Sequence, residues 1–279
     1  MKSKTTYFPK YEYLKWYEKL ILNTCCYFPP KPRRVRGVDL KIDLNEYELK
    51  FIKAYDIKSL DQFYNKKILD FGCGEGGFAV AIANKLPNSQ ITGIDLLEGQ
   101  QAANKIKKEK KLDNLKFIIS SSENLESNSF DFVFSHDSFE HFEDPEFILS
   151  EMIRITKPSG YILIKFGPAW ASPFGRHMSG TYRRDRPWIH LIIPEKIMMR
   201  VHSVYHNRPV LYEKYKDLEG GLNKMTTRKA IKIAKKFNSV EIKEKKIKYV
   251  WKGRFLKNIP LINEMFSGSL LLKLKKKRH

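Results

Sequence analysis

The stretch Ile68-Leu69-Asp70-Phe71-Gly72-Cys73-Gly74-Glu75-Gly76-Gly77-Phe78 decides the fold class of this chain. The apolar run Lys67–Phe71 predicts a short buried strand and Phe78–Leu86 predicts a helix, so the glycines lie in a strand-to-helix turn. Glycines at such a turn let the backbone approach a bound nucleoside closely. The stretch therefore predicts an α/β domain that binds a nucleoside-containing ligand.

Two ligand templates fit the glycines. Gly72-x-Gly74-x-x-Gly77 fits the dinucleotide fingerprint, whereas Asp70-x-Gly72-x-Gly74-x-Gly76 fits a loop for S-adenosylmethionine (SAM). The acid Asp70 favours SAM, because a carboxylate attracts the ammonium group of the methionine part and repels a pyrophosphate. Asp95 ends the next predicted strand, where it can accept hydrogen bonds from ribose hydroxyls, and this feature fits either cofactor.

Strand and helix patterns alternate around the glycine turn, which predicts a parallel sheet with right-handed crossovers. Further strands are predicted at residues 90–95, 115–119, 130–135, 161–166, 240–250 and 269–275. Further helices are predicted at residues 99–111, 145–156 and from Thr226 or Thr227 to Phe237. The alternation stops after Gly167, so residues 167–222 are interpreted as an insertion.

Downstream motifs complete a family pattern. They are Ser120–Leu125, Ser129–Phe134, Glu140-His141-Phe142 and Glu151–Gly160. With the glycine loop, their order over about residues 66–166 resembles the class I SAM-dependent methyltransferases, specifically the type 11 methyltransferase domain. The resemblance implies a SAM-dependent enzyme with a Rossmann-like seven-stranded α/β sheet, helices on both faces and a final antiparallel strand pair.

The resemblance also implies which residues hold SAM. The methionine end would lie at the glycine loop, the ribose at Asp95, and the adenine beside Leu96. The family often has Asp where Ser121 stands, so Ser121, or the backbone of Ser122 with the Glu123 side chain, would contact the adenine. The implied cofactor residues are Asp70, Gly72, Cys73, Gly74, Gly76, Asp95, Leu96, Ser121, Ser122, Glu123, Ser135 and His136.

Residues 167–222 leave the carboxyl end of the predicted sheet, where ligands of open α/β sheets bind. We expect them to form a substrate lid with Trp170, Tyr182 and Trp188 as acceptor contacts; the alternative is a packed helix pair without ligand contact. An extended stretch would place Trp188 and His190 on one face. His190 and His177 are then expected to point into the SAM cleft, with Trp188 or Trp170 as an apolar wall.

Methyl transfer to an alcohol requires a base, and histidine is suited to that role near neutral pH. The catalytic candidates are His190, His177 and His141, with His136 as a further possibility. Asp137-x-x-Glu140-His141 would place three ligand types on one helical face and resembles the metal-binding Glu-x-x-Glu-His of some RNA and quinone methyltransferases. Because Glu-His is commonplace at this site in the family, we expect no metal.

The formal net charge of +21 is concentrated in residues 226–279, which hold 17 basic and 3 acidic residues. A basic face can serve RNA, anionic lipid or a phosphorylated substrate. The 39 lysines against 13 arginines favour solvated helix faces instead, because nucleic-acid sites use arginine forks. In the N-terminal arm, helical spacing of Tyr13, Trp16, Tyr17, Leu20 and Ile21 predicts a helix docked on the domain, or one lying on a membrane surface.

The remaining features bound the class of protein. No apolar run is long enough for a spanning helix and no signal peptide is evident. Cys25, Cys26 and Cys73 form neither a disulfide framework nor a zinc pattern, which favours the cytoplasm. The expected units are an arm (1–65), a SAM-binding core (66–166), a lid (167–222) and a C-terminal helix and hairpin (223–279). The expected function is O-methylation of a small molecule; RNA methylation and a non-catalytic SAM-binding role are the alternatives.

Overall fold

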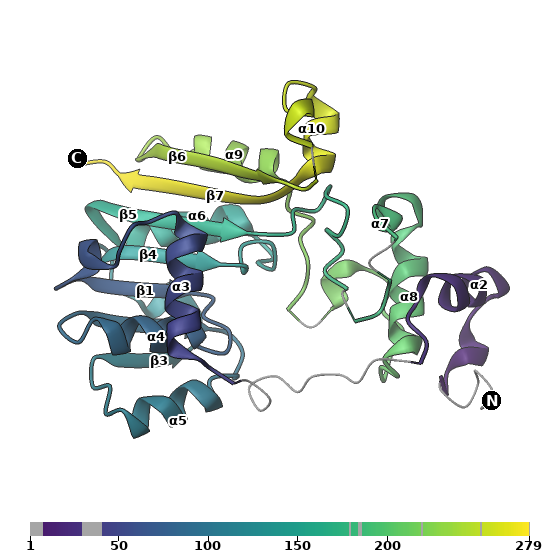
Figure 1. Cartoon of the computed structure of the whole chain (residues 1–279), viewed down its shortest axis with the longest axis horizontal. Helices are drawn as coiled ribbons and strands as arrows, with labels where there is room; N and C mark the ends of the chain where they lie inside the picture. Colours follow the sequence, from purple (N-terminus) through teal and green to yellow (C-terminus); the bar gives the residue numbers. More distant parts are fainter. Residues whose placement is uncertain are drawn as a thin grey trace.

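A computed structural model of the chain describes residues 8–29, 41–178, 180–183, 186–218, 220–251 and 253–278. Its centre is one seven-stranded sheet with the order β3-β2-β1-β4-β5-β7-β6 (Figure 1). The strands are β1 (Lys67–Phe71), β2 (Gln90–Asp95), β3 (Leu115–Ile119), β4 (Phe130–His136), β5 (Thr156–Phe166), β6 (Val240–Tyr249) and β7 (Ser267–Lys276). The first five are parallel, and β7 runs antiparallel to both β5 and β6. The predicted sheet is confirmed.

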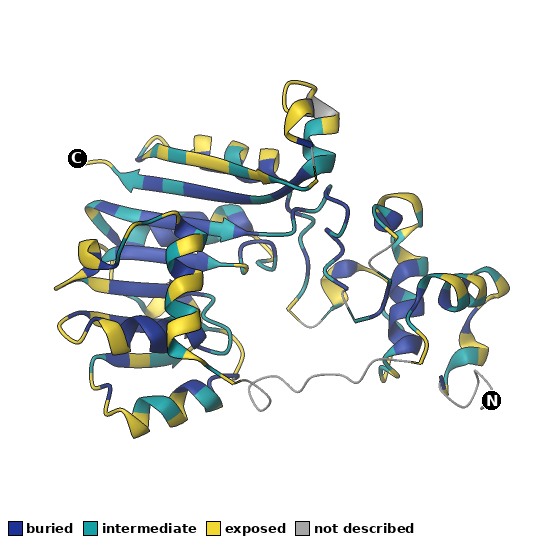
Figure 2. Cartoon of the chain, viewed as in Figure 1, coloured by how far each residue is buried: buried dark blue, intermediate teal, exposed yellow. Residues whose placement is uncertain are grey.

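Helices cover both faces of the sheet. The helices α3 (Leu44–Tyr55), α4 (Gly77–Lys85) and α5 (Gln101–Glu109) share one core cluster, whereas α6 (Pro145–Ile155) and α9 (Thr227–Lys235) share another. The strand β1 connects the two layers, because Ile68 enters the first cluster and its neighbour Leu69 enters the second. Figure 2 shows the resulting buried central strands between helices whose outer faces are exposed.

Side-chain caps explain where several helices begin. Asp43 accepts a hydrogen bond from the Glu46 amide before α3, and Asp144 accepts from two amides before α6. Thr226 caps α9 as predicted, accepting from the Lys229 amide at 3.1 Å. Each cap satisfies an amide that has no partner within its own helix.

A third core cluster lies outside the sheet and joins the described part of the arm to the lid. The helix α2 (Trp16–Cys25) packs on α8 (Glu195–Tyr205), and the buried Glu18 accepts from Arg200 Nε at 2.7 Å. In Figure 1 these two helices lie side by side, away from the strands. Residues 8–28 therefore pack with the lid, while α3 packs on the sheet.

The face by which α2 docks differs from the predicted one. Leu22 and Glu18 are buried, whereas Trp16 is 77% exposed and Tyr13 and Leu20 are also exposed. Tyr13, Trp16 and Leu20 thus lie on the outer side of the arm. The expectation that the set forms the docking face was wrong for these three residues, whereas Ile21 does pack against the third cluster. The buried Glu18 has its charged partner on α8.

The lid contains a short helix where an extended stretch was predicted. The helix α7 (Ile189–Ile192) begins after Trp188, whose φ is +57°, and the Leu191 amide donates to the Trp188 carbonyl oxygen. Side chains two residues apart diverge in a helix. Trp188 accordingly contacts Trp251 and Phe266, whereas His190 contacts Trp170.

The connection between β6 and β7 is longer than a hairpin turn. It contains η5 (Gly253–Leu256) and α10 (Pro260–Phe266), which project beyond the sheet (Figure 1). The other short 3₁₀ turns are η1 (Tyr11–Tyr13), η2 (Asp61–Phe63), η3 (Ser122–Asn124) and η4 (Tyr215–Asp217). Within the described ranges, no helix combines the length and apolar character needed to cross a membrane.

Candidate active site

The glycine loop is held in one shape by its neighbours. Gly72, Gly74 and Gly76 have φ values of +75°, +55° and +79°, the left-handed region that glycine tolerates best. A Cβ atom at Gly76 would lie 2.7 Å from the Phe117 ring, so that position is also closed sterically. At Gly74 no described atom lies within 4 Å of the corresponding position. The loop is therefore packed at its base and open at Gly74, where a ligand can approach its backbone.

Two acids lie beside this loop, as predicted. Asp70, at the end of β1, is 2% exposed, and burial together with the nearby Asp95 raises its pKa well above the usual range. Asp95 accepts hydrogen bonds from the Gly74 amide at 2.7 Å and the Leu97 amide at 2.9 Å. An ammonium group near Asp70 would favour the ionised form of this carboxyl group, and the methionine end of SAM carries such an ammonium group.

The predicted adenine residues are only partly available. Leu96 is 70% exposed, and Ser121 and Glu123 are exposed at the start of η3. The Ser122 hydroxyl is buried and donates to Glu151 at 3.1 Å, and Arg154 binds the same carboxylate. The side chain of Ser122 therefore supports the loop, which leaves its backbone as the possible ligand contact.

Two loop-supporting residues were missed from the sequence. Gln100 Nε2 donates to the Gly74 carbonyl oxygen, and Ser138 Oγ donates to the Gly72 carbonyl oxygen at 2.8 Å. Each acts through side-chain hydrogen bonds to the main chain and carries no spacing signal. Ser138 matters most for the site, because it ties the segment after β4 to the glycine loop.

The end of β4 lies against the core. Ser135 is fully buried, and the His136 ring contacts Phe78 with centroids 4.4 Å apart. His136 Nε2 lies 3.4 Å from an oxygen of Asp137, whose other oxygen accepts from Lys165 at 2.8 Å. Asp137 has φ +48°, so residues 137–141 do not form the helical face expected for an Asp-x-x-Glu-His group.

Glu140 and His141 meet His177 from the lid instead. One ligand atom from each of the three residues lies within 4.8 Å of the others, and the two imidazole rings pack edge to face. His141 Nδ1 lies 2.8 Å from the Gly221 carbonyl oxygen, and His177 Nε2 lies 2.7 Å from that of Pro168. We refer to Glu140, His141 and His177 as the junction cluster, because it joins core and lid.

Glu140 is the most deeply buried member of the junction cluster, and His141 and His177 are partly buried. Burial, assisted by the nearby Asp137, raises the pKa of Glu140 to about 8, although backbone amides of Glu140 and Gly167 offset part of this effect. Burial also lowers the pKa of His177, with a smaller opposing effect from the Pro168 carbonyl. A buried carboxyl group with a raised pKa beside two imidazoles is a candidate for proton transfer.

The other lid candidates are turned away from solvent. Tyr182 is fully buried and donates to the Met198 carbonyl oxygen at 2.6 Å, so it presents no face to an acceptor and that prediction was wrong. His190 is 5% exposed and lies 2.7 Å, through Nε2, from the Trp170 carbonyl oxygen, and burial lowers its pKa to about 4. Trp188 donates to the Met265 carbonyl oxygen at 3.2 Å, so it packs on the β6–β7 connection and not on the junction cluster. His177 is thus the lid histidine that the fold brings to His141.

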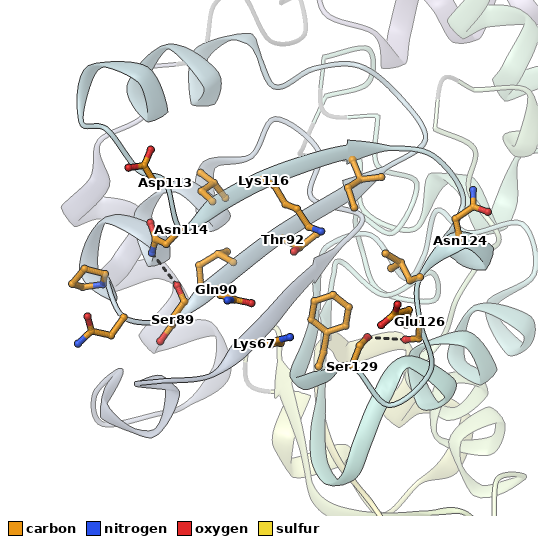
Figure 3. A pocket seen from close by; sticks show the side chains of 17 residues that line it. Lys67, Ser89, Gln90, Thr92, Asp113, Asn114, Lys116, Asn124, Glu126 and Ser129 are labelled. Atoms are coloured by element: carbon orange, nitrogen blue, oxygen red, sulfur yellow. Dashed lines mark hydrogen bonds between the residues drawn. The ribbon is translucent and has the colours of Figure 1, made fainter.

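A cavity of about 750 Å³ lies at the opposite edge of the sheet. Figure 3 shows it at the amino ends of the first strands, with Lys67, Gln90 and Asn114 among its lining. The chain between β3 and β4 contains only the short turn η3. The face of the sheet beside this cavity is therefore not covered by a long helix from that connection. Its polar lining includes neither a histidine nor a cysteine, and we place no chemistry there.

Comparisons with known proteins agree with this geometry. Residues 63–170 match a family model described as a methyltransferase domain. An uncharacterised methyltransferase of Schizosaccharomyces pombe is 33% identical over 129 residues, which cover 43% of this chain and 42% of that protein. Malonyl-[acyl-carrier protein] O-methyltransferase 2 of Ilyobacter polytropus is 30% identical over 164 residues, 58% of each chain. The matches thus span about half the length of these curated relatives.

A solved structure shares the fold at greater length. A Listeria monocytogenes protein described as a SAM-dependent methyltransferase superposes with a TM-score of 0.52 and 17% identity, covering 84% of this chain and all of that one. This likeness bears on the fold alone. Because the matched domain, the sheet order and the glycine loop with its two acids agree, residues 63–170 form a methyltransferase domain with the fold of the class I SAM-dependent methyltransferases.

Proposed function

We propose that this enzyme transfers the methyl group of SAM to a hydroxyl group of a small molecule. The observation that carries the proposal is the junction cluster, in which a buried carboxyl group and two imidazoles lie next to a segment that Ser138 ties to the glycine loop. Ser138, which donates to the Gly72 carbonyl oxygen, precedes Glu140 by only two residues, so little chain separates the glycine-loop contact from the junction cluster. An alcohol requires such groups, because its proton must leave as the new bond forms.

The reaction needs little from the protein beyond alignment and proton removal. Bound at the glycine loop between Asp70 and Asp95, SAM would supply an activated methyl group for the acceptor oxygen and would leave as S-adenosylhomocysteine. The junction cluster would take up the proton that the hydroxyl group releases. Since the donor is already activated, the glycine loop and the lid act mainly by holding the reactants and excluding water. The O-methyltransferase name of the Ilyobacter polytropus relative supports an oxygen acceptor over a nitrogen or carbon acceptor.

We also propose a cytoplasmic location. Cys25, Cys26 and Cys73 are not joined by disulfide bonds, which suits a reducing compartment. We interpret the positive charge of the C-terminal quarter, residues 226–279, as solvated surface charge and not as a binding site for a partner. Several of its lysines pair with acids, as Lys273 does with Glu244 at 2.6 Å, and others lie on the edge strand β6, where charge discourages pairing with another sheet.

The test is an acceptor screen with methyl-labelled SAM. Pools of small hydroxyl compounds, small amines and total RNA would each be incubated with the full chain, and labelled product would be followed together with S-adenosylhomocysteine release. We expect label in the hydroxyl pool. Label confined to amines or to RNA would contradict the proposed acceptor class, and SAM binding without turnover in any pool would favour the non-catalytic alternative.

A further inference from the structure

The junction cluster has the donor composition of a metal site. Glu140 and His141 come from the segment after β4, and His177 comes from the lid after β5. Asp137, which the sequence pattern placed with them, is instead paired with His136 and Lys165. The fold has therefore exchanged one expected acid for an imidazole from a different element.

The hydrogen bonds of the two imidazoles fix which nitrogens carry lone pairs. A carbonyl oxygen only accepts, so His141 must donate from Nδ1 to Gly221, and His177 must donate from Nε2 to Pro168. His141 Nε2 and His177 Nδ1 are then unprotonated in the neutral rings. Metal-binding histidines are usually oriented in this way, with the other ring nitrogen bound to a carbonyl or carboxylate.

Glu140 supplies the third donor. Glu140 is 1% exposed, and apart from weak contacts with the backbone amides of Glu140 and Gly167, its carboxylate oxygens have no hydrogen-bond partner among the described residues. Its position is fixed by the main chain, because the Glu140 carbonyl oxygen accepts from the Asn223 amide at 2.9 Å and Asn223 Nδ2 donates to the Phe139 and Phe142 carbonyl oxygens. A buried carboxylate without a partner requires a compensating positive charge.

We propose that Glu140 Oε, His141 Nε2 and His177 Nδ1 bind one divalent transition-metal cation of the Zn²⁺ type. Two imidazoles and one carboxylate suit Zn²⁺ or Co²⁺ and disfavour Mg²⁺, which prefers oxygen ligands. Three protein ligands leave at least one coordination position for water or for an oxygen of the acceptor. Because His177 belongs to the lid, the cation also links the lid to the core.

This inference rests on the proposed function and deepens it. An acceptor oxygen would take the open position, and the bound cation would lower the pKa of that hydroxyl, in place of direct proton transfer to the three side chains that bind the cation. Cation binding itself does not depend on the acceptor. A titration without SAM or acceptor therefore tests the site alone, and the acceptor screen described above can fail while this titration succeeds.

The experiment is a calorimetric titration of the full chain, purified without a histidine tag, with Zn²⁺ and then with Mg²⁺. We expect one Zn²⁺ per chain and no comparable binding of Mg²⁺. His177→Ala and His141→Gln should each weaken Zn²⁺ binding by at least about 10²-fold, as loss of a ligand does. Far-UV circular dichroism would confirm that both variants remain folded.

A matched control separates this cluster from other histidines. His202 and His206 lie one helical turn apart, with ring centroids 4.5 Å apart, and could bind Zn²⁺ by themselves. His206→Ala should leave the junction site intact, with one Zn²⁺ still bound. Bound Co²⁺ should give visible absorption in the wild type and in His206→Ala, but not in His177→Ala.

Two results would overturn the proposal. One is a wild-type chain that binds no Zn²⁺ at millimolar concentration, which would indicate that Glu140 shares a proton with the imidazoles instead. The other is Zn²⁺ binding that His206→Ala abolishes and His177→Ala leaves unchanged.

Discussion

The glycine-loop edge of the sheet and the lid use histidines and acids in different ways. At the sheet edge, Asp70 and Asp95 follow strand ends, so their positions depend on a few residues of local chain. In the lid, His177 and His190 are thirteen residues apart in sequence, yet His177 reaches the core while His190 is buried beside Trp170. The position of a site residue in the core therefore follows from the local sequence pattern, whereas its position in the lid depends on tertiary packing.

The largest effect should separate these two lid histidines. We expect His177→Ala to lower the methyl-transfer rate by about 10²- to 10⁴-fold, because it removes a member of the junction cluster. His190→Gln should retain most of the rate, since His190 packs inside the lid. Labelled-product formation on an acceptor from the screen measures both, with SAM affinity as the control. Equal loss of rate in the two variants would remove the distinction between them.

The attachment of the arm to the lid can be broken at one ion pair. Arg200→Ala would leave Glu18, which is 2% exposed, without its charged partner. Loss of one partner of a buried pair destabilises by about 3 kcal/mol. Hydrogen exchange should show faster exchange across residues 8–28 and α8, with β1 and β4 unchanged.

The distribution of faster hydrogen exchange tests whether residues 8–28 are attached to the lid or to the sheet. A matched variant is Lys19→Ala, whose pair with the exposed Glu12 is a surface contact. It should change little. If Arg200→Ala accelerated exchange in the sheet as much as in the arm, residues 8–28 would be coupled to the core and not to the lid.

The sequence predicted the core well because its signals are local. The Lys67–Phe71 strand, the Thr226 cap and the acids at strand ends each depend on neighbouring residues. The lid was harder, because Tyr182 and Trp188 resemble substrate contacts in sequence, and only packing shows that Tyr182 bonds to Met198 and Trp188 to Met265. Likewise, the predicted group contained Asp137, but Lys165 binds that carboxylate, and the third member of the junction cluster is His177 from the lid.

The buried His190 should make lid stability depend on pH. Burial lowers its pKa to about 4 in the folded chain, below the unfolded value of about 6.5. The unfolded chain therefore binds the proton more readily, so the stabilisation is complete above pH 6.5 and is lost as the pH falls toward 4. The loss should be about 2 kcal/mol.

Urea unfolding at pH 7 and pH 4.5 measures this dependence. His190→Gln should reduce the difference between the two pH values, whereas His206→Gln, which replaces a partly exposed histidine, should leave most of it. A wild-type difference that His190→Gln does not alter would place the pH-sensitive group elsewhere.

The smallest effect should come from the surface lysines. Lys232, Lys235, Lys245 and Lys248 are exposed on α9 and β6. Their joint replacement by Gln should change stability by less than about 0.5 kcal/mol per site and leave turnover of a small acceptor intact. Truncation is a poorer test, because Lys276 donates to Asn128 and to main-chain oxygens of Ile153 and Thr156. Binding of RNA that falls steeply with salt and disappears in the variant would instead support an RNA substrate.

The most direct test of the account is a calorimetric titration with SAM of the wild type, Asp95→Ala and Asp113→Ala. Asp113 is an exposed acid at the opposite edge of the sheet and serves as the control. We predict that Asp95→Ala weakens SAM binding by about 1.5 to 3 kcal/mol, while Asp113→Ala leaves it unchanged. Unchanged affinity in Asp95→Ala, or NADH bound as tightly as SAM by the wild type, would contradict the assignment of the glycine loop to SAM.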